Sequence, residues 1–260
     1  MSPVRVLILR AAGVNCDREA AHAWTCAGAE VELVHIRALC EQPGRIDSCR
    51  IITLPGGFSY GDDLGAGRIL AAQIERYLAD ALHRFVERGG LLLGICNGFQ
   101  VLVKAGFLPE RAPPRQRACT ITFNQPAGFQ DRWVRLRAAD TPCAFLEPGR
   151  EYEMPIAHGE GRVVFRDDAL AADAVAQRRA ALLYAPSPDA GDERPYNPNG
   201  STADIAGLTD ATGRVLGLMP HPDRFVEWTQ HPCWTSLPER PRGDGLALFE
   251  RGVAHVRGSR

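Results

Sequence analysis

The chain contains 260 residues, of which 45% are hydrophobic and 23% are charged, and its formal net charge is −1. This composition is ordinary for a globular protein, and the near-neutral charge gives no electrostatic argument for nucleic acid or an anionic membrane as a partner. No apolar run approaches the roughly 20 residues of a membrane-spanning helix, and the first apolar run, residues 4–9, is too short for a signal peptide. The eight cysteines include no Cys-X-X-Cys pair, so we expect no metal site and a cytoplasmic location.

The first part of the chain alternates apolar strands with amphipathic segments. Strands are predicted at residues 4–9, 31–36 and 50–54, because runs with little alternation are typical of parallel strands buried on both faces. A helix between the first two strands is expected to use Asp17 as its N-cap and to end at Gly28. Strand, helix and strand at this spacing predict the α/β class, with a doubly wound, mostly parallel sheet.

A glycine-rich segment, residues 55–67, follows the third strand. It lacks the Lys-Ser/Thr of a phosphate-binding P-loop, and its glycine spacing is not that of a dinucleotide site. A structural turn is an alternative reading, but ligands of such sheets bind at the carboxyl ends of strands, which favours a functional loop. One long amphipathic helix is predicted after it, over residues 68–86.

The next strand ends in a motif with a cysteine between two glycines, Gly94-Ile95-Cys96-Asn97-Gly98. Apolar residues precede the motif and an amphipathic stretch follows it, so the sequence predicts a strand, a tight turn and a helix. Glycine on both sides of a nucleophile is what a crowded strand-to-helix turn requires. A thiol at a helix N-terminus is also favoured as thiolate. A buried structural cysteine is the common alternative, but this context predicts that Cys96 is a nucleophile.

The remainder of the chain is predicted to complete the same domain, over residues 1–260, with an irregular loop and helix extension from about residue 226. Its expected elements are strands at 118–124 and 132–137 as an antiparallel extension of the sheet, a helix at 167–179, a hairpin of 205–209 with 214–219, and a closing helix at 244–255.

A nucleophilic cysteine needs a base, and the base needs an orienting carboxylate. His221 follows the last apolar strand between two prolines, and Asp223 comes two residues later. Residues two apart in extended backbone point to the same side, so the two side chains are expected to touch. Acyl transfer also needs donors to the developing oxyanion, which the backbone N–H groups of Gly57 and Asn97 can supply.

Four motifs together resemble class I glutamine amidotransferases and, more narrowly, the glutaminase subunits of phosphoribosylformylglycinamidine synthase. They are Leu-Pro-Gly-Gly-Phe-Ser-Tyr-Gly-Asp-Asp-Leu at 54–64, Gly-Ile-Cys-Asn-Gly-Phe-Gln at 94–100, His-Gly-Glu-Gly at 158–161 and Met-Pro-His-Pro-Asp-Arg at 219–224. The resemblance implies Cys96 as nucleophile and His221 as general base and then acid, with Gly57 and Asn97 at the oxyanion.

The same resemblance implies that Gln100 helps to hold the substrate and that the loop at His158 and Gly159 contacts its α-carboxylate or amine. The reaction implied is hydrolysis of L-glutamine through a γ-glutamyl thioester. The ammonia would pass to a large synthetase subunit that uses ATP and Mg²⁺, so no cofactor is expected in this chain. Whether a small third subunit is also needed stays open. The family has glutamate where this chain has Asp223, and we expect Asp223 to orient His221 despite its shorter reach.

Two other functions remain alternatives. One is a stand-alone cysteine amidase or hydrolase of the same fold, which the hydrolysed amide would distinguish. The other is a non-catalytic amidotransferase-like binding module, against which Cys96 and His221 both argue. Selective labelling of Cys96 by a glutamine-like electrophile would separate an active site from an inert one.

Overall fold

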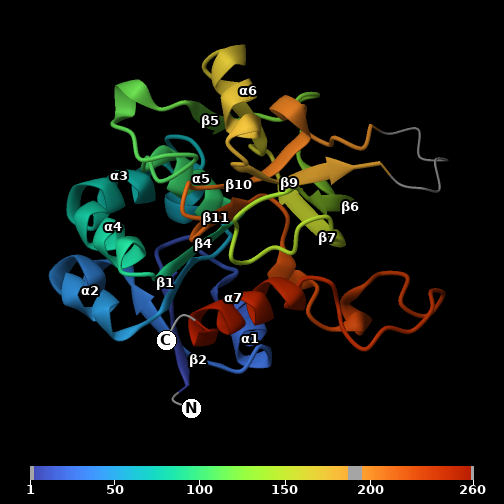
Figure 1. Ribbon diagram of the computed structural model, residues 1–260, viewed down its shortest axis with the longest axis horizontal. Helices are drawn as coiled ribbons and strands as arrows, with labels where there is room; N and C mark the ends of the chain where they lie inside the picture. Colours follow the sequence, from blue (N-terminus) through green and yellow to red (C-terminus); the bar gives the residue numbers. More distant parts are fainter. Residues whose placement is uncertain (1–2, 187–194, 259–260) are drawn as a thin grey trace.

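A nine-stranded mixed sheet organises the computed structural model, which describes residues 3–186 and 195–258 (Figure 1). Within these residues the strand order is β2-β1-β3-β4-β11-β10-β9-β6-β7. The first five strands in that order run parallel to one another, whereas β10, β9, β6 and β7 pair antiparallel. The predicted α/β class with a mostly parallel sheet and an antiparallel extension is therefore confirmed.

The bounds of the sheet strands follow in spatial order. They are β2 (Ala29–His35), β1 (Val4–Arg10), β3 (Ile51–Leu54), β4 (Leu91–Ile95), β11 (Val215–Leu218), β10 (Ile205–Thr209), β9 (Ala180–Ala185), β6 (Gln130–Ala138) and β7 (Glu151–His158). Every residue of β3, β4 and β11 is buried, as expected for central strands covered on both faces.

Helices cover both faces of the parallel half. The helices are α1 (Asp17–Cys26), α2 (Ile36–Glu41), α3 (Arg68–Tyr77), α4 (Ala79–Glu87), α5 (Asn97–Lys104), α6 (Asp168–Ala176) and α7 (Leu246–Gly258). In Figure 1, α1 and α7 lie together on one side of the sheet, and α2, α3 and α4 lie on the other. The edge of the Trp24 ring packs on Phe249 with ring centroids 4.9 Å apart, and this contact joins α7 to the core.

Several predicted elements need correction. The predicted helix over residues 68–86 is two helices, because Leu78 has φ −127° and breaks the first. Asp17 is not the N-cap: Cys16 takes that position, and the Asp17 carboxylate instead pairs with Arg10 at 2.6 Å. β5 (Cys119–Thr122) does not extend the main sheet, since it pairs with β8 (Arg162–Phe165) in a separate two-stranded sheet.

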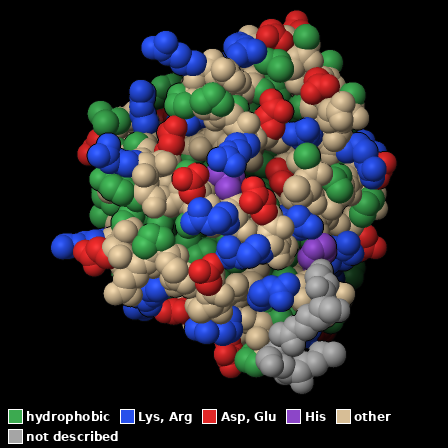
Figure 2. Space-filling view, turned by 60° about the vertical axis from the view of Figure 1, so that its left-hand side comes forward, with side chains coloured by type: hydrophobic (Ala, Val, Ile, Leu, Met, Phe, Trp, Pro, Cys, Tyr) green, Lys and Arg blue, Asp and Glu red, His purple; other side chains and the backbone are tan. Residues whose placement is uncertain are grey.

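The surface of the molecule carries both signs of charge. Figure 2 shows Lys and Arg side chains interspersed with Asp and Glu over one face, in keeping with the net charge of −1. No helix in the described part of the chain is both long enough and apolar enough to cross a membrane.

Candidate active site

Cys96 occupies the tight turn between β4 and α5, as the motif predicts. Its backbone has φ 50° and ψ −106°, a strained conformation that non-glycine residues rarely adopt. The turn leaves no room for side chains on either flank. A Cβ at Gly98 would overlap the carbonyl oxygen of Leu54, and one at Gly94 would lie 2.7 Å from the carbonyl oxygen of Gly98. The glycines are therefore needed to hold Cys96 at this turn.

His221 and Asp223 lie together just beyond β11. Both are almost completely buried, and Nδ1 of His221 is 3.3 Å from Oδ1 of Asp223. The predicted contact is present, but its predicted reason is wrong, because the chain here turns into the short 3-10 helix η5 (Pro222–Arg224) instead of staying extended. The backbone N–H of His221 donates to the carbonyl of Pro155 at 2.8 Å, which fixes the histidine against β7.

The Asp223 carboxylate is poorly satisfied. The contact with His221 lies at ion-pair distance without hydrogen-bond geometry, and neither carboxylate oxygen finds a donor among the described residues. An uncompensated buried carboxylate is unfavourable, so the adjacent imidazole is best accommodated as a cation.

The pKa of His221 responds to these neighbours. Burial by itself would lower the pKa, but the negative charge of the Cys96 thiolate and contacts with Asp223, Cys16 and Cys96 outweigh it and raise the pKa well above its usual value. His221 is thus an imidazolium near neutral pH, and it contacts Cys96, so its proton is available to a leaving group there.

Two backbone amides lie close to Cys96, because Gly57 lines the same pocket and Asn97 directly follows Cys96 in the chain. Gly57 has φ +135°, and a Cβ there would lie 2.7 Å from both the amide nitrogen of Asn15 and the carbonyl oxygen of Gly13. Asn97 is the first residue of α5. Neither amide donates to another group in residues 3–186 and 195–258, so both are available to a ligand.

The Asn97 side chain connects the two donor segments. Its Oδ1 accepts from the backbone N–H of Ser59 at 3.2 Å, and its Nδ2 donates to Oδ1 of Asp62 at 3.1 Å. Asp62 in turn accepts from the backbone N–H of Gly67 at 3.1 Å. The glycine-rich loop is thereby tied to the cysteine turn.

A pocket of about 190 Å³ opens at Cys96. The pocket is lined by Gly57, Phe58, Asp62, Ala66, Cys96, Gln100, Phe123, Phe129, Ala157, His158, Gly159 and Glu160. Three candidate substrate residues, Gln100, His158 and Gly159, therefore reach the same space as the thiol. The pocket is smaller than the roughly 300–1,000 Å³ of sites for drug-sized ligands, and it suits a ligand no larger than an amino acid.

Gln100 and His158 line the pocket, and polar contacts with neighbouring residues fix both side chains. The Gln100 amide donates to the carbonyl of Glu160 and accepts from Nδ2 of Asn97 at 2.9 Å. Nδ1 of His158 lies 3.1 Å from Oδ1 of Asn124. Burial, together with the positive charge of His221, lowers the pKa of His158 to about 3, so His158 is neutral at physiological pH.

Cys16 is a site residue that the sequence reasoning missed. A Cβ at Gly56 would lie 2.8 Å from Cε1 of His221, 3.2 Å from Sγ of Cys16 and 3.4 Å from Cβ of Cys96. These three residues therefore surround Gly56. The guanidinium of Arg224 donates to Sγ of Cys16 at 3.2 Å, while burial raises the pKa of the Cys16 thiol. The sequence indicated this position in part, because Cys16 ends the loop after the first strand, and that loop lies at the same edge of the sheet.

Two groups in the described residues have ligand atoms close enough to hold a metal ion. One consists of Cys16, His221 and Asp223, and its atoms lie within 4.8 Å of one another. A metal there would occupy His221 and remove it from proton transfer. The other, His22, Cys26 and Glu227, is exposed.

The family model for the CobB/CobQ-like glutamine amidotransferase domain matches residues 3–256. The chain belongs to this family. The enzyme class predicted from the motifs, a glutamine amidotransferase, is thereby confirmed.

Relatives and solved structures agree with this family. The chain is 42% identical to a phosphoribosylformylglycinamidine synthase subunit PurQ of Dehalococcoides mccartyi, over 99% of each chain. It is 40% identical to the subunit of the same name from Thermus thermophilus, over 86% of this chain and 91% of that one. The structure of PurLQS from Thermotoga maritima matches with a TM-score of 0.71 and 32% identity, over 98% of both chains.

Proposed function

We propose that this amidotransferase is the glutaminase subunit of phosphoribosylformylglycinamidine synthase. Its part of the reaction is the hydrolysis of L-glutamine to glutamate and ammonia. The observation that carries the proposal is the buried Cys96, His221 and Asp223 group opening on a pocket of about 190 Å³. The PurQ name and nearly full-length match of the relative from Dehalococcoides mccartyi support this choice of synthase.

The first half of the reaction forms a thioester. The Cys96 thiolate attacks the side-chain amide carbon of glutamine, and the amide oxygen becomes an oxyanion. The N–H groups of Gly57 and Asn97 then donate to that oxygen, and each such donor typically lowers the barrier by about 2.7–4 kcal/mol. The protonated His221 gives its proton to the departing nitrogen, which leaves as ammonia while the γ-glutamyl thioester forms.

The second half returns the thiolate. The now neutral His221 removes a proton from water, and the resulting hydroxide adds to the thioester carbon. The C–S bond breaks, releasing glutamate, and the imidazolium again pairs with the Cys96 thiolate. In this scheme Asp223 holds a negative charge beside His221 through both steps, while Gln100, His158 and Gly159 bound the pocket around the substrate.

We infer that the ammonia is used by another protein, which the names of the PurQ relative and of the PurLQS structure support. We infer a synthetase partner of the large-subunit type, which would use ATP and Mg²⁺ to convert formylglycinamide ribonucleotide to formylglycinamidine ribonucleotide. The match to the Thermotoga maritima PurLQS structure supports such a partner and is compatible with a small third subunit. We infer a cytoplasmic location, which the eight free thiols support.

An electrophilic glutamine analogue tests the site directly. It is expected to label the full-length chain once, and excess glutamine should protect. Cys96→Ser should abolish labelling, whereas the exposed Cys233 offers a matched control, so that Cys233→Ser should label like wild type. Absence of selective labelling, with or without the synthetase partner, would favour a non-catalytic module.

A second assay separates the proposed enzyme from a stand-alone amidase. Glutamate release from glutamine should rise strongly when the synthetase subunit is added. Efficient hydrolysis of other amides with no response to the partner would contradict the assignment.

A further inference from the structure

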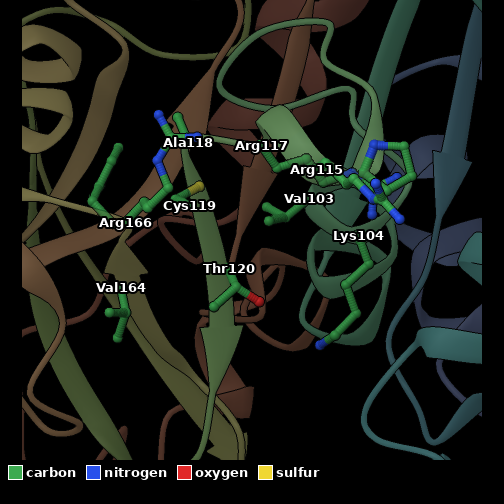
Figure 3. A pocket seen from close by; sticks show the side chains of 11 residues that line it. Val103, Lys104, Arg115, Arg117, Ala118, Cys119, Thr120, Val164 and Arg166 are labelled. Atoms are coloured by element: carbon green, nitrogen blue, oxygen red, sulfur yellow. The ribbon is translucent and has the colours of Figure 1, made fainter.

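A second, larger cavity lies away from Cys96. Its volume is about 470 Å³, and it is bounded by the end of α5, the segment at residues 114–118, β5 and β8. In Figure 3, Arg115 and Arg117 lie together on the side of α5, and Arg166 lies on the other side of β5. The cavity adjoins a second hollow of about 340 Å³, since Lys104, Pro114, Arg117 and Thr120 line both.

Positive charge is concentrated around these hollows. The cations that line them are Arg68, Lys104, Arg115, Arg117 and Arg166, and the lining contains one carboxylate, that of Glu75. The whole chain has a net charge of −1, so this concentration departs from the mixed surface seen elsewhere. A concave wall of one sign raises the local concentration of ligands of the opposite sign.

Among the described residues, no carboxylate lies within hydrogen-bond reach of the Lys104 ammonium. Its ammonium donates to the carbonyl of Ile121 at 3.1 Å. Burial lowers the pKa of Lys104, although the more distant charges of Glu160 and Asp62 oppose that effect. A partly buried ammonium gains most from an anion placed against it.

The arginines are also incompletely paired. Arg117 donates to Glu75 at 3.1 Å, but its Nε is buried and has no hydrogen-bond partner among the described residues. Arg166 forms an ion pair with its neighbour Asp167 at a distance of 3.8 Å, beyond hydrogen-bond length. No ion pair involves Arg115 in the part of the chain that the structure describes. The guanidinium groups therefore keep donors free for a ligand, and their fork geometry matches phosphate oxygens.

We propose that this cavity binds a phosphate-bearing small molecule of about the size of a nucleotide. The volume falls within the roughly 300–1,000 Å³ of small-molecule sites. Val103, Val164 and Phe165 also line the cavity and give it apolar surface for the ring of such a ligand, while Lys104 and the arginines take the phosphate.

Calorimetric titration of the full-length chain with AMP, ATP, pyrophosphate and inorganic phosphate tests this binding. Saturable binding of at least one nucleotide is expected, and inorganic phosphate should compete for it. The double variant Arg115→Glu/Arg166→Glu reverses two exposed cations and should raise the dissociation constant about tenfold or more, since the charged hydrogen bonds to the phosphate are lost.

Arg18→Glu is the matched control. Arg18 is exposed on α1, which contributes no residue to either hollow, so the same charge reversal there should leave the dissociation constant unchanged. Three outcomes would overturn the proposal. They are no saturable binding of any probe at millimolar concentration, equal affinity in the double variant, and binding of an acidic peptide but of none of the four phosphate compounds.

Discussion

Replacing Asp223 with asparagine removes the charge behind His221 while keeping the size of the side chain. Asp223 is 1% exposed, its Oδ1 lies at ion-pair distance, 3.3 Å, from Nδ1 of His221, and neither carboxylate oxygen has a hydrogen-bond donor among the described residues. Its role in the proposed reaction is therefore electrostatic: it stabilises the imidazolium that protonates the departing nitrogen. Asp223→Asn should weaken that stabilisation without opening a cavity.

The expected loss follows from the size of such interactions. A charge-assisted contact is typically worth about 1.5–3 kcal/mol, and 1.36 kcal/mol corresponds to a tenfold change in rate. Turnover of glutamine by Asp223→Asn should thus fall about ten- to hundredfold. Because Asp223 is one of the groups that raise the pKa of His221, the variant should lose its imidazolium at lower pH, and the alkaline limb of its activity profile should move down in pH.

The assay is glutamate release as a function of pH, with the synthetase subunit present and thermal unfolding as the check on folding. Asp223→Glu is the control that keeps the charge, and it should retain more activity than Asp223→Asn even if the extra methylene costs stability. The reasoning fails if Asp223→Asn folds normally and keeps both the wild-type turnover and the wild-type alkaline limb.

Two further predictions concern the cysteine turn and the buried histidine beside it. Gly98→Ala places a methyl group against the carbonyl of Leu54 and should cost about 3 kcal/mol or more of unfolding free energy in urea titrations, whereas Gly44→Ala, with open space around it, should cost little. The pKa of His158 is about 3 in the folded chain, against about 6.5 unfolded, so protonation of the unfolded state makes stability fall as pH drops below 6.5. Between pH 7 and pH 5, the free energy of unfolding of His158→Gln should therefore fall by about 2 kcal/mol less than that of the wild type. If the unfolding free energies of the two proteins depend on pH in the same way, His158 is not a buried neutral histidine.

The sequence predicted the parallel half of the fold because its signals are local. The strands there are apolar runs. The glycines beside Cys96 and in the loop at residues 55–67 mark tight turns, because glycine tolerates backbone conformations and close approaches that other residues do not. The break at Leu78 was invisible, since Leu78 is buried and continues the apolar spacing of the helices on either side.

Strand β7 was missed for a different reason. Its residues alternate between buried and partly exposed positions, but Pro155 in its middle argues against a strand. The structure resolves the conflict, because β7 is the last strand of the sheet and tolerates a proline. The carbonyl of Pro155 then accepts the N–H of His221. The placement of Cys16 beside His221 could be predicted only in part, since it depends on packing between segments 205 residues apart in sequence.

The proposed oxyanion donors come from separate elements, so their alignment depends on what ties those elements together. Asn97 provides the tie through its side chain, which accepts from the N–H of Ser59 and donates to Asp62 and Gln100. Asn97→Ala keeps the backbone N–H in place and removes only this connection. If the loop carrying Gly57 then shifts, the oxyanion loses part of the stabilisation from the Gly57 N–H, which for one donor is roughly 2.7–4 kcal/mol.

Turnover of Asn97→Ala should accordingly fall about tenfold or more. Gln100→Ala is the comparison, because it breaks the contact with Asn97 but leaves the connection to the loop. Steady-state glutaminase kinetics with the synthetase subunit present would measure both variants. A larger loss of turnover in Asn97→Ala than in Gln100→Ala would show that the connection between Asn97 and the loop supports catalysis. Near wild-type turnover in Asn97→Ala would show that the loop holds Gly57 in position without Asn97.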